Sequence, residues 1–330
     1  MKKILGIGNA LVDVLIRLKN DKLLSNFGLK KGSMTLVDKQ KTNNILEAVA
    51  SLDKQKSSGG SVANSIHGLA QLGAPAGYIG KIGDDEYGSF FRSYMTQNNI
   101  NSSLFKGREE TGKCISLISE DSERTFATYL GAAIELDKSD LTIDLFKGYG
   151  YFHLEGYLVQ NHALLQEAVS LSRKAGNEIS IDLASYNIVQ ENVDFLRTIV
   201  DDYIDIVFAN EEEARAFTGK EDPEEALTEI SKMCRIAVVK IGKQGSLIAE
   251  GNRRFRVDPI TAVSVDTTGA GDLYASGFFY GLAKEYSLDI CGQMASAAAG
   301  KVVEVIGAKM NDNKWNEAMQ LVGKIENKKI

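Results

Sequence analysis

A run of small residues that ends in a single carboxylate is the part of the chain best suited to chemistry. Residues 265–272 read VDTTGAGD and follow ITAVSV, a β-branched run that indicates a buried strand. Beyond them, Leu273, Phe278 and Leu282 recur at helical spacing. The stretch therefore predicts a junction at which a strand leads through a tight loop into a helix.

The residue types at that junction favour binding of an anion. Gly269, Ala270 and Gly271 would let backbone N–H groups converge where the helix begins, and the positive end of the helix dipole adds to them. Asp272 then has two interpretations, a helix cap or a base held beside the bound anion. The Gly-Ala-Gly run favours the base, because an ordinary cap needs no uncluttered approach to the backbone.

Composition limits the classes of protein that the chain can belong to. It has 330 residues, 44% hydrophobic and 25% charged, enough to bury a large core. The net charge of −6 argues against a nucleic-acid partner, and no apolar run has the length that spans a bilayer. Three widely spaced cysteines, Cys114, Cys234 and Cys291, fit neither a disulfide framework nor a metal site, so we expect a cytoplasmic protein.

Strand-like and helix-like segments alternate along most of the chain, which predicts one α/β domain over residues 1–330. Its sheet would be mostly parallel and doubly wound, with helices on both faces. Two β-rich regions, about 12–37 and 101–131, interrupt this rhythm, and the second contains a hairpin with its turn at 120–123. We expect these regions to form a small discontinuous β-sheet that acts as a lid and excludes water. Residues 57–61 (SSGGS) predict a flexible stretch before the next helix.

Three motifs in order resemble the PfkB, or ribokinase-like, family of carbohydrate kinases. SGGSVANSIHGLAQLG (58–73), followed by GKIGDDEYG, is similar to the first family signature, and VDTTGAGDLYASGFF (265–279) is similar to the second. Between them, NEEE at 210–213 resembles the Asn-x-x-Glu motif of the family. The resemblance implies an ATP-dependent kinase for a hydroxymethyl group of a nucleoside or sugar, with a ribokinase-like fold. Asp272 would be its catalytic base, and the amides of Gly269, Ala270 and Gly271 would hold the transferring phosphoryl group.

The resemblance also implies the residues that bind the acceptor. Asp13 would accept hydrogen bonds from two vicinal hydroxyls, Gly59 and Gly60 would let the backbone approach the sugar, and Asn64 would reach a hydroxyl. Arg124, in the lid turn, would move onto the phosphates. Each has a plainer alternative: Asp13 as a strand end facing solvent, the glycine pair as a simple helix start, and Arg124 as a surface arginine.

On the nucleotide side, the resemblance carries over to further positions and to the cofactors. It implies ATP with Mg²⁺, where Glu213 acts on the metal through water, although acidic residues are favoured at a helix start in any case. It also leaves K⁺ open, beside Asp266 and Thr268. The residues that it places along the nucleotide are Asn210, Lys240, Gly242, Gly245 and Ser296.

The acceptor is the least determined part of the interpretation. GNALVDVLIRL and ETGKCISLISEDSERTF follow the adenosine kinase branch, but Met34 departs from it, and Tyr157, Tyr186 and Asn187 do not clearly form its purine wall. A nucleoside is therefore preferred over ribose, fructose or a related ketose, and the protein would be a monomer or a homodimer. Two other classes of protein fit the sequence less well. Residues 6–11 (GIGNAL) begin like the fingerprint of a dinucleotide-binding dehydrogenase but lack its third glycine, and a non-catalytic sensor would be expected to have lost Asp272, which this chain keeps.

Overall fold

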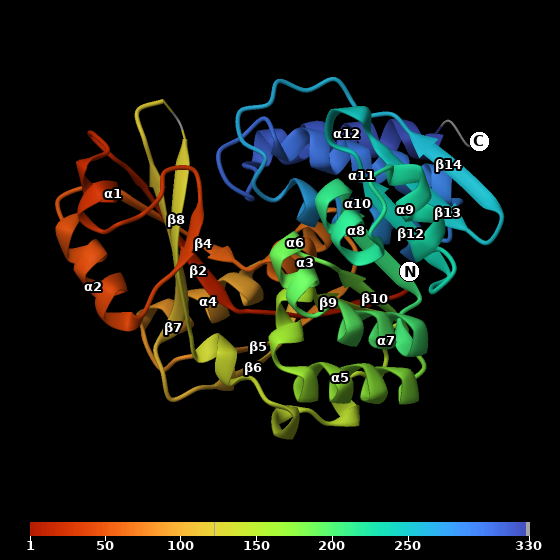
Figure 1. Cartoon of the computed structure of the whole chain (residues 1–330), viewed down its shortest axis with the longest axis horizontal. Helices are drawn as coiled ribbons and strands as arrows, with labels where there is room; N and C mark the ends of the chain where they lie inside the picture. Colours follow the sequence, from red (N-terminus) through yellow and green to blue (C-terminus); the bar gives the residue numbers. More distant parts are fainter. Residues whose placement is uncertain (122, 328–330) are drawn as a thin grey trace.

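Two β-sheets of unequal size organise the computed structural model, which describes residues 1–121 and 123–327. Within those ranges the larger sheet has nine strands in the order β14-β13-β12-β11-β10-β9-β1-β5-β6, and the smaller has five in the order β3-β8-β7-β2-β4. Figure 1 shows the small sheet on the left of the molecule and the large sheet on the right. The strands of the large sheet are β1 (Ile4–Ile7), β5 (Ala76–Ile82), β6 (Asn101–Lys106), β9 (Tyr151–Glu155), β10 (Glu178–Asp182), β11 (Ile206–Asn210), β12 (Ile236–Lys240), β13 (Ser246–Glu250) and β14 (Arg253–Val257).

The large sheet confirms the predicted α/β class. In the order of the sheet, every pair of neighbouring strands from β6 across to β12 is parallel. At the opposite edge, β13 pairs antiparallel with both β12 and β14. Its strands are apolar on both faces: in β11, Ile206 and Phe208 join one core cluster, and Val207 and Ala209 join the other. Continuous apolar strands of this kind are typical of a parallel sheet that helices cover on both sides.

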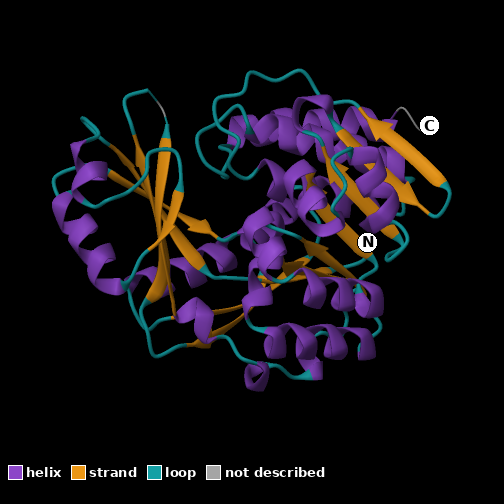
Figure 2. Ribbon diagram, in the orientation of Figure 1, coloured by secondary structure: helices purple, strands orange, loops and turns teal. Residues whose placement is uncertain are grey.

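The helices divide between the two faces of the large sheet (Figure 2). Buried residues of α3, α4, α10, α11 and α12 belong to one core cluster, and those of α5, α6, α7, α8 and α9 belong to the other. The helices are α1 (Lys22–Asn26), α2 (Lys39–Ala48), α3 (Ser61–Gln71), α4 (Glu86–Gln97), α5 (His162–Lys174), α6 (Tyr186–Glu191), α7 (Val193–Tyr203), α8 (Glu211–Thr218), α9 (Pro223–Ile230), α10 (Ala270–Ala283), α11 (Leu288–Val302) and α12 (Asp312–Asn327), with short 3₁₀ turns η1 (Ala132–Glu135), η2 (Lys138–Asp140), η3 (Ile143–Leu145), η4 (Gly156–Gln160) and η5 (Gly242–Gln244).

The small sheet has one covered face and one open face. Its strands are β2 (Leu11–Arg17), β3 (Met34–Leu36), β4 (Lys54–Gly59), β7 (Thr111–Ile118) and β8 (Arg124–Gly131). On the covered face, Val14 and Ile115 pack with residues of α1 and α2 in a core cluster of their own. On the other face Met34 is 50% exposed and Leu36 is 54% exposed, so an apolar surface stays open toward the large sheet.

The extent of the small sheet differs from the prediction in two places. Residues 101–106, expected in the lid, form β6 and pair with β5 in the large sheet. Residues 54–59, expected in part as a flexible stretch, form β4, because their backbone pairs antiparallel with β2 from Leu11↔Gly59 to Ile16↔Lys54. Of the predicted hairpin turn, Ser122 lies outside the described residues.

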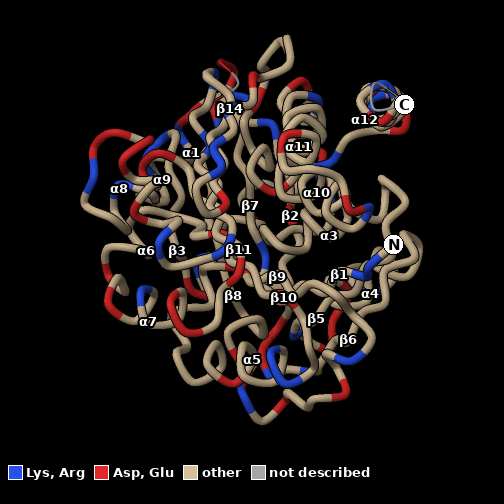
Figure 3. Tube along the Cα trace, turned by 90° about the vertical axis from the view of Figure 1, so that its right-hand side faces the viewer, with Lys and Arg blue, Asp and Glu red and all other residues tan. Residues whose placement is uncertain are grey.

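Two further observations concern the helices as possible membrane spans and the distribution of charge. None of the helices within residues 1–121 and 123–327 combines the length and the apolar character that a membrane-spanning segment needs. Acidic and basic residues are interspersed along the trace (Figure 3). The edge strand β14 carries three exposed arginines, Arg253, Arg254 and Arg256.

Candidate active site

Residues 260–265, predicted as a buried strand, form an irregular segment in which Val263 is 77% and Val265 is 52% exposed. The loop that follows brings backbone amides to the first turn of α10. Gly269 is the N-cap with φ +80°, a left-handed conformation that glycine adopts without strain, and a Cβ there would collide with Ala308. A Cβ on Gly271 would lie 3.1 Å from Nζ of Lys240, so the missing side chain leaves room for that ammonium group. No side chain of the described residues caps this helix, but the N–H of Ala270 donates to the carbonyl oxygen of Thr267 at 3.1 Å. The amides of Gly269 and Gly271 are therefore the ones left to bind an anion.

Asp272 makes its contacts across the site rather than to its own helix. Its Oδ1 accepts a hydrogen bond from Oγ of Ser61 at 2.7 Å, and its Oδ2 accepts one from Nδ2 of Asn64 at 2.9 Å. Both donors lie on the first turn of α3, three residues apart and hence on one face. Burial raises the pKa of Asp272 to about 6, although these hydrogen bonds lower it. The cap interpretation is wrong, because Gly269 is the cap and Asp272 faces a cavity.

Asp13 lies within β2 on the open face of the small sheet, which excludes the interpretation as a strand end in solvent. A Cβ on Gly59 would overlap its carboxylate, and a Cβ on Gly60, at φ +96°, would overlap the carbonyl oxygen of Asn9. The glycine pair is therefore required for close approach. Burial raises the pKa of Asp13 to about 6, against the charge of Lys309, which lowers it.

A cavity of about 960 Å³ lies between the two sheets and joins these residues. One end is polar and contains both carboxylates, Asp13 and Asp272, together with Asn64. The rest is mostly apolar and is formed largely by the open face of the small sheet and by η1 and η4. Its apolar side chains are Leu11, Met34, Leu36, Phe126, Leu130, Ala133, Ile134, Leu136, Leu158, Leu164, Ala184 and Ile188. Polar residues are interspersed among them, namely Gln160, Asn161, His162, Ser185 and Asn187.

Glu155 is a cavity residue that the sequence reasoning missed. It ends β9, and its carboxylate accepts hydrogen bonds from Nδ2 of Asn9 at 2.7 Å and from the backbone N–H of Val62 at 3.3 Å. Burial raises its pKa to about 7. A signal was present, since an acidic residue directly after the apolar run YFHL would stand at the carboxyl end of a parallel strand, where α/β sheets bind ligands.

Polar or charged residues end three neighbouring strands, and one of them, Lys240, lies beside Gly271 at the α10 N-terminus. Nζ of Lys240, at the end of β12, donates to Oδ2 of Asp182, at the end of β10, at 2.8 Å, and both side chains are largely buried. Asn210, at the end of β11, forms a reciprocal capping box with Glu213 on α8. Burial raises the pKa of Glu213 to about 7. Glu213 thus stabilises the helix start, where acidic residues are favoured, and its role toward magnesium stays a prediction.

Arg124 crosses from β8 to the loop before α10. Its Nη1 lies 2.7 Å from Oδ2 of Asp266, and the guanidinium is buried, so it is not a surface arginine. Oδ1 of Asp266 also accepts hydrogen bonds from the backbone N–H and the Oγ1 of Thr268, and the N–H of Gly307 donates to Oδ2 at 2.6 Å. The structure therefore brings together Asp266 and Thr268, as predicted, but with an arginine as the charged partner of Asp266.

Three predicted nucleotide contacts stand apart from this cluster. Gly242 and Gly245 have φ values of +54° and +92° in the turn between β12 and β13, and a Cβ on Gly245 would strike the carbonyl of Val257. Ser296, on α11, donates to the carbonyl of Asp258 at 3.0 Å and accepts from the N–H of Ile260 at 3.2 Å. These contacts fix the backbone along the predicted nucleotide path. In the described structure, Gly242, Gly245 and Ser296 do not line the cavity.

The family of the chain follows from its match to known proteins. The chain belongs to the pfkB family of carbohydrate kinases, whose model matches residues 29–315. It is therefore a kinase that transfers a phosphoryl group to an alcohol, and the kinases of this family use ATP.

Relatives with named activities include kinases for nucleosides and for sugars. The fold resembles that of a probable sugar kinase from Rhizobium etli (32% identity, TM-score 0.87, 98% of this chain and 99% of that one). It is equally similar to an adenosine kinase from Sinorhizobium meliloti (32% identity, TM-score 0.86, 97% and 99%). A 5-dehydro-2-deoxygluconokinase from Clostridium perfringens is 28% identical over 262 residues (74% of this chain and 78% of the relative).

Proposed function

We propose that the protein transfers the γ-phosphoryl group of ATP to the 5′-hydroxyl of a nucleoside, with a purine nucleoside such as adenosine as acceptor. The observation that carries this proposal is the division of one cavity of about 960 Å³ into a carboxylate end and a mostly apolar remainder. A pentose would fill only the polar end. The apolar side chains, Leu36, Phe126 and Leu130 among them, suit a flat base, and the similarity to an adenosine kinase supports the same choice.

The two carboxylates of the polar end would have different roles. Asp13 would accept hydrogen bonds from the two vicinal hydroxyls of the ribose. Asp272 would receive the proton of the 5′-hydroxyl as its oxygen bonds to phosphorus and the bond to the leaving ADP breaks. With a pKa of about 6, Asp272 is ionised at neutral pH and yet basic enough to accept that proton. The amides of Gly269 and Gly271 would stabilise the charge on the transferring group, and that of Ala270 would join them once its hydrogen bond to the carbonyl of Thr267 opens.

The strand ends beside α10 suit the triphosphate and a magnesium ion. Lys240 would pair with phosphate oxygens near Gly271, and Asn210 and Gly242 would flank the nucleotide. No cluster of three metal-ligating side chains occurs in the described parts of the chain, which fits an Mg²⁺ held mainly by phosphate and water. Glu213 would act through that water, and the ion would neutralise charge on the phosphates. Asp266 and Thr268 could still admit K⁺ if Arg124 leaves them for the phosphates.

A sugar kinase is the second candidate. The polar end would bind any vicinal diol, and relatives include a probable sugar kinase and a 5-dehydro-2-deoxygluconokinase. In that case the apolar part of the cavity would be filled by the small sheet as it closes over a smaller acceptor.

Release of ADP across a panel of acceptors separates these candidates. Adenosine, guanosine, ribose, fructose and 5-dehydro-2-deoxygluconate are compared at equal ATP and Mg²⁺, with and without K⁺. The proposal expects kcat/KM for one of the purine nucleosides to exceed that for every free sugar. A free sugar as the preferred acceptor would replace the nucleoside proposal, and no turnover with any acceptor would leave the substrate outside both classes.

A further inference from the structure

The carboxylate of Asp266, in the loop before α10, is surrounded by four hydrogen-bond donors. Its Oδ1 accepts from the backbone N–H of Thr268 at 3.0 Å and from the Oγ1 of the same residue at 2.8 Å. Its Oδ2 accepts from the N–H of Gly307 at 2.6 Å and lies 2.7 Å from Nη1 of Arg124. A carboxylate has about four lone-pair sites, so these donors use all of them.

This set of groups does not fit a monovalent cation beside Asp266 and Thr268. Hard cations are bound through the lone pairs of oxygen atoms. Here the four contacts of the carboxylate are all donors, and the Oγ1 of Thr268 in turn accepts from Nη1 of Arg124 at 3.3 Å. The carbonyl oxygen of Val303, which lies against this loop, accepts from the N–H of Val265 at 2.7 Å and from that of Asp266 at 3.2 Å. The positive charge beside the carboxylate is therefore the guanidinium group of Arg124.

The same contacts hold the anion-binding loop (residues 266–271) in place. The hydrogen bonds from Thr268 fix the chain directly before Gly269, the N-cap of α10. On the other side, a Cβ on Gly269 would lie 2.5 Å from the Cβ of Ala308, so residues 307 and 308 pack directly against the N-cap. Asp266 binds that segment through the N–H of Gly307. A shift of this carboxylate would therefore move the backbone that presents the amides to an anion.

Arg124 brings the compensating charge from the small sheet, because it begins β8. Its side chain is 9% exposed and that of Asp266 is 10% exposed, so water screens neither charge well. We propose that Arg124 is a positioning residue whose guanidinium group takes the place of a monovalent cation beside the anion-binding loop, so that phosphoryl transfer proceeds without K⁺. The inference rests on the proposed function of that loop. In the alternative, Arg124 leaves Asp266 for the phosphates and K⁺ enters, so turnover depends on K⁺.

The dependence of turnover on K⁺ tests this role. Release of ADP is measured in tetramethylammonium buffer, and K⁺ then replaces tetramethylammonium at constant ionic strength, so that screening does not change. The wild type should keep the same kcat at every K⁺ concentration. Arg124→Ala should lose about 10–100-fold in kcat without K⁺, because the loop no longer holds the phosphoryl group in line. K⁺, or guanidinium at about 20 mM, which is far below the molar range that unfolds proteins, should restore part of that loss.

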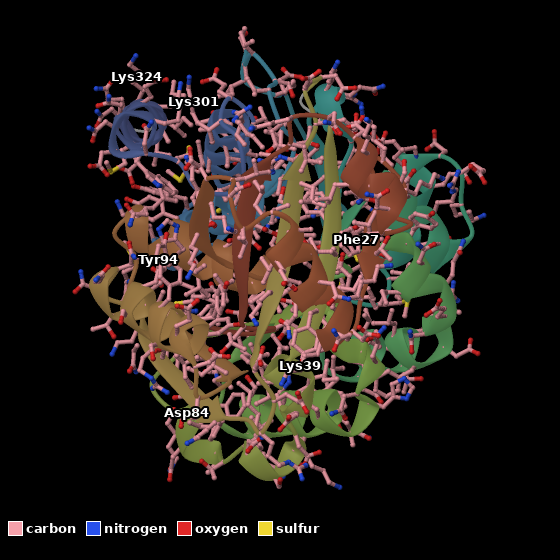
Figure 4. The ribbon with its side chains drawn as sticks, turned by 90° about the vertical axis from the view of Figure 1, so that its left-hand side faces the viewer. Phe27, Lys39, Asp84, Tyr94, Lys301 and Lys324 are labelled. Atoms are coloured by element: carbon pink, nitrogen blue, oxygen red, sulfur yellow. The ribbon has the colours of Figure 1, made fainter. Side chains whose placement is uncertain are left out.

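Two further variants separate this role from a direct contact with phosphate. In Asp266→Asn, the additional Arg124→Ala substitution should cost little, because Arg124 acts through Asp266, whereas a direct contact with phosphate would make the two losses add. Lys39→Ala is the matched control. It removes an exposed cation from another ion pair, since Nζ of Lys39, the α2 residue labelled in Figure 4, lies 3.0 Å from Oε1 of Glu110. Its kcat should match the wild type with and without K⁺.

Three kinetic results would overturn the proposal. They are activation of the wild type by K⁺, an Arg124→Ala variant that neither K⁺ nor guanidinium restores, and additive losses in the double variant. The wild-type measurement stands even if Arg124→Ala does not fold.

Thermal unfolding gives a second readout that needs no acceptor. A cation that binds only the folded protein raises its Tm. Exchange of tetramethylammonium for K⁺ should therefore raise the Tm of Arg124→Ala and leave that of the wild type unchanged. This pattern in a protein that phosphorylates no nucleoside would uphold the role of Arg124 and remove the nucleoside assignment. A wild-type Tm that rises with K⁺ would overturn the role even in an active nucleoside kinase.

Discussion

The two sheets hold their functional side chains in different ways. In the large sheet these residues stand at the carboxyl ends of strands: Glu155 on β9, Asp182 on β10, Asn210 on β11 and Lys240 on β12. In the small sheet, Asp13 projects from the middle of β2 into the cavity. The apolar cavity residues Leu36, Phe126 and Leu130 likewise lie within or along small-sheet strands.

This difference separates what is fixed from what can vary. Helices cover both faces of the large sheet, and its strand-end residues are tied by hydrogen bonds and ion pairs such as Lys240–Asp182. The small sheet leaves Met34 and Leu36 half exposed on its open face. We infer that the large sheet supplies the geometry of phosphoryl transfer, and that the small sheet decides which acceptor is bound. The predictions that follow test this division.

Removal of the base should have the largest effect. Asp272→Asn keeps the size of the side chain but cannot accept the proton, so kcat should fall by about 10²–10⁴-fold. Nucleotide affinity, measured by calorimetry, should change little. Normal turnover in this variant would show that Asp272 is not the base.

Loss of the diol contact should act on binding rather than on turnover. Asp13→Ala removes a charged acceptor of two hydrogen bonds and should raise the KM of the acceptor by about 10–100-fold, with a smaller change in kcat. The KM for ATP should stay the same, because Asp13 belongs to the small sheet. If acceptor kinetics do not change, the proposed role of Asp13 is wrong.

The apolar face should distinguish nucleosides from sugars with a smaller effect. Leu36→Ser should raise the KM for adenosine by about 3–10-fold, since part of the contact with the base is lost, and leave the KM for ribose unaltered. Met319→Ser, at a residue of α12 that is 41% exposed, is the matched control and should alter neither. A parallel loss for both acceptors would argue against a base-binding wall.

A buried carboxylate of the large sheet should affect stability in a pH-dependent way. The pKa of Glu155 is about 7 in the folded protein, against an ordinary value of 4.5, so the folded state binds more protons between these values. Glu155 therefore destabilises the fold increasingly as pH rises from about 4.5 to 7. The Tm of Glu155→Gln relative to the wild type should rise across this interval and level off above it, as calorimetry at several pH values can measure. A constant difference would mean that Glu155 ionises at its ordinary pKa.

The parallel core could be predicted from the sequence because it rests on local patterns. The same holds for most of the residues that the structure brings together at the candidate site. Strands such as ILGI and IVFAN are continuous apolar runs, and the loop before Asp272 combines glycines with a helix start. β4 could not be predicted in the same way. Its sequence, KQKSSG, has weak strand propensity, and it is a strand because its backbone pairs with β2.

Residues whose role depends on partners far away in the chain could also not be predicted from the sequence. The pairing of Arg124 with Asp266 joins the small sheet to the loop before α10, and no local signal in either segment announces it. Long-range charge pairing of this kind is set by topology rather than by local pattern.

The arginines of β14 bear on how the protein behaves at high concentration. β14 is last in the order of the large sheet, so among the described strands one side of its backbone has no neighbour to bond. Such an edge can recruit a strand from another molecule and extend the sheet into an aggregate. Arg253 pairs with Glu250 and Arg256 lies 3.9 Å from Glu224, whereas Arg254 has no ion pair among the described residues. Two copies approaching through that border would have to desolvate these charged side chains before their backbones could pair.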